Sequence, residues 1–301
     1  YDIYITDKWA IYVFDNSGIY NMNLNVLEEN GEIPDISLGY IICGGGEGGG
    51  HSTINGYALK YGYGGAPGYV KYEYETISSD SDGNINIQMS IGSGGEASGS
   101  KTQSEGGEPG NLSSVTINGI IYDSSGGSND IDMTDDYNAN NYNSSLNHII
   151  IDTDFEIKLG GRGGYGNNLV HSNYFDASYG GGGGGGSYDI SNGGISDSYG
   201  VKGLYKQLNG DTDYKYFTTG DNGTSYLDPS GGNGGNGYYG GGGGGGGFGD
   251  TSSNYGLGGK GGKGVVCIII DKTKFGSVIK DVETIQCGTL EAFQIETTKL
   301  K

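Results

Sequence analysis

Glycine runs alternate with β-rich stretches along the whole chain, and this alternation limits the possible folds more than any other feature. The longest runs hold seven glycines, at 180–186, and eight glycines, at 240–247. Glycine has no side chain to bury and loses more backbone entropy on ordering than other residues, so one such run would suggest a flexible linker. Many runs placed between strands indicate instead that both kinds of segment belong to one fold. The glycine-rich segments are 44–50, 62–68, 92–99, 106–110, 160–166, 180–186, 231–237, 240–249 and 256–264.

The stretches between the glycine runs are typical of β-strands, because they alternate apolar and polar residues or form short apolar runs. Turn signals predict two hairpins: one joins 68–77 to 84–92 through "SSDSDG", and the other folds 113–123 at its "NG" pair. No convincing amphipathic helix occurs before residue 276, and the mixed periodicity of 277–301 leaves that segment open. The predicted strands lie within 9–15, 19–28, 39–43, 68–77, 84–92, 113–123, 145–159 and 264–272.

Polyglycine can form an ordered structure when several copies lie side by side. In a left-handed threefold helix every N–H and C=O points outward, so neighbouring helices can bond to one another where no Cβ holds them apart. At ~3.1 Å per residue, the two longest runs would span about 22 and 25 Å. We therefore expect an all-β chain in which β-sandwich-like strands flank a bundle of polyglycine II helices. The expected scaffold glycines are Gly180, Gly183, Gly186, Gly240, Gly243 and Gly247.

The sequence divides into a glycine-rich domain at 1–270 and a C-terminal extension or attachment segment at 271–301. The chain has 16 Lys and Arg residues and 36 Asp and Glu residues, which gives a formal net charge of −20. This balance argues against nucleic-acid binding, since no basic patch is available to neutralise phosphates. No apolar run approaches the ~18 residues that a membrane span needs, so we expect no membrane insertion.

No group of residues forms a recognisable catalytic or metal site, so we expect no enzyme and no cofactor. Asp80, Asp82 and Asn84 in "DSDGN" resemble the start of a calcium loop, but the glycine is misplaced and no later Glu closes the loop. An Asp-Gly hairpin turn is the favoured interpretation, and calcium the weaker one. The histidines are too scattered for acid–base or metal chemistry; they are His51, His148 and His171.

The three cysteines form no disulfide framework. Cys43 and Cys267 each lie in an apolar predicted strand, which favours buried free thiols, and the third is Cys287. Three Asn-x-Ser/Thr sequences could carry glycans in a eukaryotic setting; they begin at Asn111, Asn143 and Asn222.

Tyrosine is abundant, at 26 residues, and many tyrosines flank glycine runs. A rigid ring with a hydroxyl is a good contact residue for proteins or sugars. Such rings are either displayed at turns of the bundle, where they could contact a receptor, or packed along its sides. The candidates for ligand contact are Tyr179, Tyr188, Tyr199, Tyr238, Tyr239, Phe248 and Tyr255.

The order of segments over 19–270 resembles the glycine-rich domains of bacteriophage tail-fibre and adhesin proteins and of giant-virus surface proteins. The segments that carry the resemblance are "SGIYNMNLNV", "YIICGGGEGGG", "GYGGAPGYVKYEYETI", "NINIQMSIGSGGEASG", "GGEPGNLSSVTING" and "GGKGGKGVVCIII". The insert 129–148 and the tail beyond 271 have no counterpart in that pattern. The resemblance implies strands flanking a polyglycine bundle, and a place at the receptor-contacting end of a virion appendage.

We therefore expect a non-enzymatic virion surface protein, from a fibre, tail or capsid decoration. Its polyglycine scaffold would display loops rich in Tyr, Asn and Asp to a host cell-surface glycan or protein. The second hypothesis is a purely structural subunit of a fibre, capsid lattice or extracellular matrix, whose loops contact other virion proteins or copies of itself.

Overall fold

The structure is a computed structural model of the 301-residue chain. It describes residues 2–5, 9–25, 32–33, 35–51, 53–55, 58–60, 64–98, 107–128, 148–152, 155–158, 188–189, 193–194, 202–206, 214–219, 233, 235–237, 240–243, 256–271, 281–286 and 289–294.

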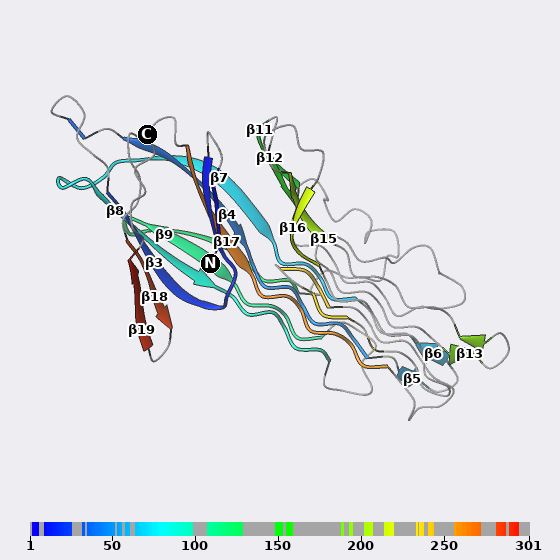
Figure 1. The fold of residues 1–301 in the computed structure, drawn as a ribbon. Helices are drawn as coiled ribbons and strands as arrows, with labels where there is room; N and C mark the ends of the chain where they lie inside the picture. The colour runs from blue at the N-terminus through cyan, green and yellow to red at the C-terminus, as the bar shows by residue number, and fades with distance from the viewer. Residues whose placement is uncertain are drawn as a thin grey trace.

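Five antiparallel strands form the first sheet, which we call sheet A, in the order β1-β2-β17-β4-β7 (Figure 1). The most apolar strand, β17, lies at its centre. Val266 of β17 faces Phe14 of β2 on one side and Ile42 of β4 on the other. The strands are β1 (Asp2–Ile5), β2 (Trp9–Phe14), β4 (Ile36–Cys43), β7 (Val70–Ile77) and β17 (Val265–Asp271).

Six antiparallel strands form sheet B, in the order β10-β9-β8-β3-β18-β19. Two of them, β18 and β19, come from the part of the chain after residue 271, and β18 pairs with β3. The strands are β3 (Gly18–Asn25), β8 (Asn84–Ile91), β9 (Ser113–Ile117), β10 (Ile120–Ser124), β18 (Asp281–Gln286) and β19 (Thr289–Gln294).

The two sheets pack face to face around one apolar core. Alternate residues of each strand point inward, as in Ile85, Ile87, Met89 and Ile91 of β8, while the residues between them are polar. The core also holds Ala10, Tyr12, Phe14, Tyr20, Met22, Leu24, Ile36, Leu38, Tyr40, Ile42, Ile77, Val115, Ile117, Val266, Ile268 and Ile270.

The central strands of sheet A are buried on both faces. Residues that alternate with the core positions of β2, β4 and β17 are also at most 1% exposed: Ile11, Val13, Ile41, Cys43, Val265, Cys267 and Ile269. A strand covered on both faces needs apolar residues at consecutive positions. This explains why the sequences "YIIC" and "VVCIII" do not alternate.

The predicted hairpin between 68–77 and 84–92 is wrong. β7 pairs with β4 at the edge of sheet A, whereas β8 pairs with β3 and β9 in sheet B. The turn between them therefore crosses from one sheet to the other. Strand alternation shows which residues face the core, but it does not identify the pairing partner.

The second predicted hairpin is confirmed. β9 and β10 pair directly, with Ile117 opposite Ile120 and only Asn118 and Gly119 between them. Both turn residues have positive φ, 47° and 86°, as a type I′ turn requires. The side chain of Asn118 further fixes the turn, since its Nδ2 donates to the carbonyl of Ser78.

The remaining described strands form three smaller sheets. β11 and β12 confirm the strands expected within 145–159. β5, β6 and β13 lie at the end of the molecule away from sheets A and B (Figure 1). The three sheets hold β11 (His148–Asp152), β12 (Phe155–Lys158), β15 (Lys202–Lys206) and β16 (Tyr214–Thr219); β5 (Thr53–Asn55) and β6 (Ala58–Lys60); and β13 (Tyr188–Asp189) and β14 (Gly193–Gly194).

Every regular element in the described ranges is a strand, so the predicted all-β class is confirmed. Within those same ranges, no helix has the length and apolar character that crossing a membrane requires.

Candidate functional site: a bundle of glycine segments

The glycine segments continue from the ends of the sandwich strands and run side by side away from sheets A and B (Figure 1). We call them the glycine bundle. β4, β8 and β10 each lead directly into an outgoing segment, and β7, β9 and β17 each follow a returning one. The strands therefore hold one end of most segments. The described segments are 44–50, 64–69, 92–98, 107–112, 125–128, 235–237, 240–243 and 256–264.

Segment 44–50 occupies the centre of the bundle, and its N–H groups donate to three neighbours in rotation. Every third residue bonds to the same neighbour, with N···O distances of 2.7–3.0 Å. The bonding pattern therefore repeats every three residues, which is the repeat of the threefold helix expected from the sequence. The bonds are Gly44 N to Tyr69 O, Gly45 N to Asn111 O, Gly46 N to Gly262 O, Glu47 N to Ala66 O, Gly48 N to Glu108 O and Gly49 N to Gly259 O.

The carbonyls of the same segment bring in three further neighbours. Gly127, Gly95 and Gly243 donate their N–H groups to Gly45, Gly46 and Glu47, respectively, over 2.8–2.9 Å. The central segment therefore bonds to six others, because its backbone groups point outward in all directions around the axis.

The six outer segments also bond to one another and close a ring around segment 44–50. Each adjacent pair shares at least one backbone hydrogen bond of 2.7–3.0 Å. Going around the ring, the bonds are Gly65 N to Gly243 O, Gly262 N to Gly241 O, Gly261 N to Gly95 O, Asn111 N to Ser93 O, Gly110 N to Gly127 O and Tyr69 N to Ser125 O.

Glycine is required inside this ring for steric reasons. A Cβ added at Gly46 would overlap the carbonyl oxygen of Gly241, and one added at Gly48 would overlap that of Glu96. Backbone cannot move aside as the end of a flexible side chain can. The glycines of segment 44–50 are therefore fixed by packing rather than by flexibility.

Side chains in the outer segments recur at every third residue. Segment 92–98 exposes Ser93 and Glu96, and segment 256–264 exposes Leu257 and Lys260. A threefold helix places such residues on one side, here the solvent side. Sequence analysis missed this signal, although "GGNGGNG" and "GLGGKGGKG" carry it in plain form.

Glu47 is the one charged side chain of segment 44–50, and it is only 2% exposed. Its Oε2 accepts the N–H of Ala66 at 2.8 Å. Three residues after Ala66 in segment 64–69, the N–H of Tyr69 donates to the carbonyl of Ser125. The Glu47 carboxylate therefore plays the same part for Ala66 that a backbone carbonyl of segment 125–128 plays for Tyr69, one turn further along.

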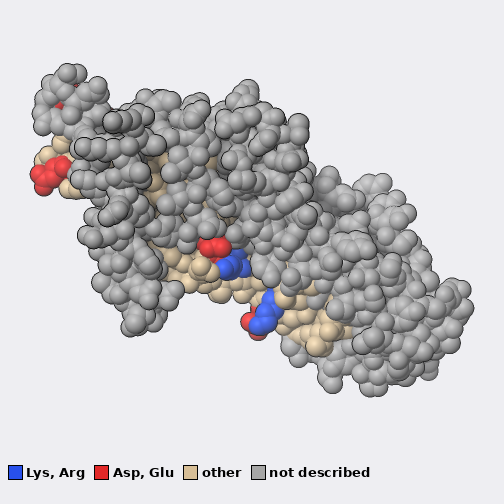
Figure 2. All heavy atoms as spheres, in the orientation of Figure 1, with Lys and Arg blue, Asp and Glu red and all other residues tan. Residues whose placement is uncertain are grey.

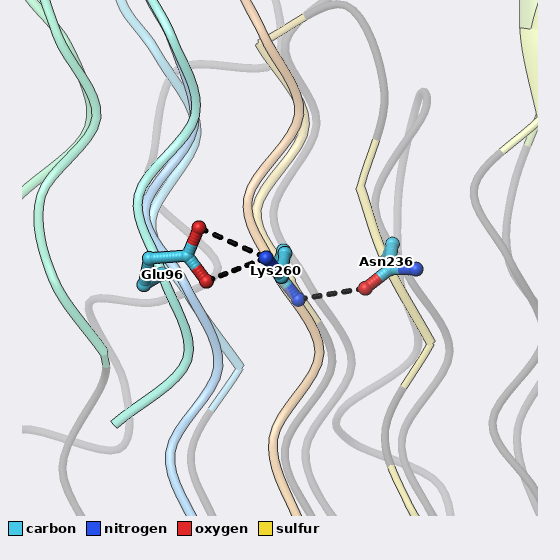
Figure 3. Close-up of polar contacts among 3 residues, drawn as sticks. All are labelled: Glu96, Asn236 and Lys260. Atoms are coloured by element: carbon cyan, nitrogen blue, oxygen red, sulfur yellow. Dashed lines mark hydrogen bonds and ion pairs between the residues drawn. The ribbon is translucent and has the colours of Figure 1, made fainter. Parts of the chain in front are cut away.

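Asparagine side chains provide backbone acceptors at the flank of the bundle. Oδ1 of Asn233 accepts the N–H of Leu257, and Oδ1 of Asn236 accepts that of Lys260, each at 2.9 Å. Lys260 also forms an ion pair with Glu96, with 2.7 Å between Nζ and Oε2 (Figure 3). Both charged side chains are more than 60% exposed, so this pair contributes at most about 1 kcal/mol.

On the face in Figure 2, the blue side chains of the described residues lie directly beside red ones. At the base of the bundle, Nζ of Lys263 donates to Oδ1 of Asn16 at 2.6 Å and lies 4.0 Å from Oδ2 of Asp15. This contact ties the last glycine segment to the connection between β2 and β3.

His51 follows directly after the central segment 44–50. Its Nδ1 accepts the N–H of Gly258 at 2.9 Å, and burial lowers the pKa of its imidazole. Of the other two histidines, His148 lies in β11, and His171 lies outside the described residues. No group of three His, Cys, Asp or Glu that could hold a metal ion occurs within the described ranges.

Two of the expected scaffold glycines lie within the described residues. Gly243 donates to Glu47, as above. Gly240 lies instead at a turn at the sandwich end of the bundle, with φ of 75°, and a Cβ there would overlap Sγ of Cys43. Four others fall outside the described residues: Gly180, Gly183, Gly186 and Gly247.

The cysteine prediction is confirmed for two residues, since Cys43 and Cys267 are buried free thiols. Burial raises the pKa of Cys43 to about 12 and also raises the pKa of Cys267. Cys287 lies outside the described residues.

Of the aromatic candidates, only Tyr188 is described, through its backbone in β13. That strand lies at the end of the bundle away from the sandwich (Figure 1). Gly237 and Gly240 flank the candidates Tyr238 and Tyr239 in the sequence. The N–H groups of these two glycines donate to the carbonyls of Lys260 and Lys263, toward the base of the bundle. The candidates outside the described residues are Tyr179, Tyr199, Tyr238, Tyr239, Phe248 and Tyr255.

The carboxylate of Asp80 organises a turn. Its Oδ1 accepts the N–H groups of Asp82 and Asn84 at 2.9 and 2.8 Å, and these bonds lower its pKa. This is the arrangement of an Asx turn, so these residues do form a turn, but it connects two sheets and is not the predicted hairpin turn. Among the candidate glycan sites, Asn111 is exposed and its Nδ2 donates to Oγ of Ser93, whereas Asn143 and Asn222 lie outside the described residues.

Comparison with protein families gives a match to the part of the chain that holds the glycine bundle. No curated protein matches the chain. A family model described as a glycine-rich domain matches residues 32–271, which begin just before β4 and end with β17. This range holds all the segments of the glycine bundle and covers more than half of the chain. The chain therefore belongs to the glycine-rich domain family.

Proposed function

We propose that the chain is a non-enzymatic virion surface protein, of a fibre, tail or capsid decoration, in which the glycine bundle displays loops for attachment to a host. The observation that supports this most is the ring of backbone hydrogen bonds around segment 44–50, which makes the bundle a stiff projection from the sandwich. Seven residues of threefold helix extend about 22 Å. A preorganised support lowers the entropic cost of binding at its far end.

The contact surface that we propose is the end of the bundle that carries β5, β6 and β13 (Figure 1). β13 contains Tyr188, and the nearby sequence is rich in Tyr, Asn and Asp. Rings and amides of this kind contact sugars and proteins well. The proposed ligand is a host cell-surface polysaccharide or outer-surface protein, and the proposed location is the virion surface or another extracellular site.

A direct test is binding of the purified chain to an array of immobilised bacterial and algal surface polysaccharides. We expect saturable binding to at least one polysaccharide, and we expect Tyr188→Ala to weaken it at least tenfold. Tyr74→Ala is the matched control, since Tyr74 is 41% exposed on β7 of the sandwich. Equal loss in both variants, or binding that neither variant changes, would contradict the proposed contact surface.

The second candidate function is a purely structural subunit of a fibre, capsid lattice or extracellular matrix. Exposed apolar side chains on the sandwich favour it, notably Ile120 and Ile121 of β10. Under this hypothesis, Tyr188→Ala leaves polysaccharide binding unaffected, and variants of the sandwich surface disrupt assembly instead.

A further inference from the structure

β10 is the terminal strand of sheet B. It pairs with β9 on one side, and no other described strand pairs with it on its outer side. A terminal strand presents unpaired backbone N–H and C=O groups that can pair with a strand of another chain.

The hairpin turn identifies the backbone groups that face outward. In a two-residue hairpin the pair next to the turn, here Ile117 and Ile120, is hydrogen-bonded, and such pairs alternate along the strands. Ile120, Tyr122 and Ser124 therefore bond to β9. The N–H and C=O groups of Ile121 and Asp123 point away from the sheet.

The side chains of this edge are apolar and exposed. Ile120 is 60% exposed and Ile121 is 68% exposed. Edge strands are usually protected by charged side chains, proline or a bulge; Ile120–Ser124 contains no lysine, proline or bulge, and Asp123 is its one charged residue. An edge of this kind is suited to pairing with another strand.

The charge of the chain indicates how two copies could meet. At a net charge of −20, two copies repel each other unless they meet where acidic groups are few. β10 contains a single acidic residue, Asp123. An antiparallel pair centred on Ile121 would place Asp123 opposite Gly119 of the other copy, and would keep the two carboxylates apart.

We propose that β10 pairs with β10 of a second copy of this chain, antiparallel and centred on Ile121. The two copies of sheet B then form one continuous sheet across a two-fold axis, with the Ile121 side chains in contact and Ile120 beside Tyr122 of the other copy. An interface of this kind is self-complementary, as two-fold symmetry requires. It is independent of any ligand bound at the far end of the bundle.

The first test is sedimentation of the full chain over a range of concentrations. We expect a monomer–dimer equilibrium, and we expect Ile121→Lys to weaken dimerisation at least tenfold. Ile19→Lys is the matched control, since Ile19 is 42% exposed on β3 of the same sheet, and it should leave dimerisation unchanged. A wild-type chain that stays monomeric, or an Ile121→Lys variant that dimerises like the wild type, would overturn the proposal.

The second test examines the register by oxidation of single cysteine variants in a Cys287→Ser background. Residues opposite each other in a hydrogen-bonded pair have Cα atoms about 5.5 Å apart, within the range of a disulfide. Ile121→Cys should therefore give a reducible dimer. Ile120→Cys should not, since its two Cα atoms would lie more than about 7 Å apart. Equal crosslinking of both variants would overturn the register.

The two proposals can fail separately. A monomeric chain that still binds polysaccharide through Tyr188 would contradict only the β10 interface. A dimer that binds no polysaccharide would contradict only the attachment function.

Discussion

Glu47 and Ala66 are joined by two hydrogen bonds between neighbouring segments of the glycine bundle. The N–H of Glu47 donates to the carbonyl of Ala66 at 2.9 Å, and the N–H of Ala66 donates to Oε2 of Glu47 at 2.8 Å. Removal of the carboxylate would leave the buried N–H of Ala66 without this acceptor. We expect Glu47→Ala to lower the free energy of unfolding in urea by about 1–3 kcal/mol.

Two variants serve as controls for this prediction. Glu47→Gln keeps a carbonyl oxygen in the side chain and should lose less stability than Glu47→Ala. Glu96→Ala removes an exposed carboxylate and should change the free energy of unfolding by at most about 1 kcal/mol. A Glu47→Ala variant as stable as Glu96→Ala would show that the hydrogen bond to Ala66 is unimportant.

Gly46 should not tolerate a side chain. A Cβ there would overlap the carbonyl of Gly241, so Gly46→Ala forces two backbone segments apart and breaks hydrogen bonds around the central segment. We expect a loss of at least ~3 kcal/mol in the free energy of unfolding, or failure to fold. Thermal unfolding monitored by circular dichroism would measure this change.

The control for Gly46 is Gly119 in the β9–β10 turn, where an added Cβ meets no atom within 4 Å. Its φ of 86° is a conformation that asparagine tolerates. Gly119→Asn should therefore cost no more than about 1 kcal/mol. Comparable losses at the two positions would argue against close packing of the bundle.

The stability of the bundle should depend on the protonation of His51. Burial lowers the pKa of His51 in the folded chain, so the unfolded chain binds more protons as the pH falls. The stabilisation is complete above the unfolded pKa of about 6.5 and is lost as the pH falls through that value toward the folded pKa. Protonation also removes the acceptor for the N–H of Gly258.

His51→Gln supplies the comparison, because glutamine does not titrate. Between about pH 7.5 and pH 5, the wild type should lose stability relative to this variant in urea unfolding. Parallel pH profiles for the two proteins would contradict the prediction.

The two buried thiols should be unreactive in the folded protein. Burial raises the pKa of Cys43 to about 12 and raises that of Cys267 as well, and the thiolate is the species that reacts. In a Cys287→Ser background, we expect no labelling by a thiol reagent in buffer and two labelled thiols in denaturant. Rapid labelling of the native chain would show that the junction between sandwich and bundle is open.

The strands could be predicted from the sequence better than their pairing. Alternation in 84–92 identified Ile85, Ile87 and Met89 as one face of a strand, and the structure buries that face. The partner of this strand was predicted wrongly, because "SSDSDG" is equally compatible with a hairpin and with a crossing between sheets. The "NG" hairpin was predicted correctly, since Asn118 and Gly119 adopt a backbone conformation that few other residue pairs favour.

The neighbours of each bundle segment could not be predicted from the sequence. Gly44 and Gly48 are both glycines in the same run, yet Gly44 bonds to segment 64–69 and Gly48 bonds to segment 107–112. The position of a residue along a threefold helix decides the direction of its N–H. The spacing of Asn233, Asn236, Leu257 and Lys260 at multiples of three did carry information on exposure. Glu47 could not be assigned a role, since a lone acidic residue among glycines is usually solvated.

The closed ring around segment 44–50 restricts how such a projection can change length during evolution. The three segments that accept from the central segment do so once per turn of three residues. An insertion of one or two residues in the central segment 44–50 would rotate every later N–H toward the wrong partner. An insertion of three residues in one segment alone would leave the new turn of that segment without neighbours. Viable length variants should therefore gain or lose whole turns in several segments together, so the reach of these proteins should vary in steps of about 9 Å.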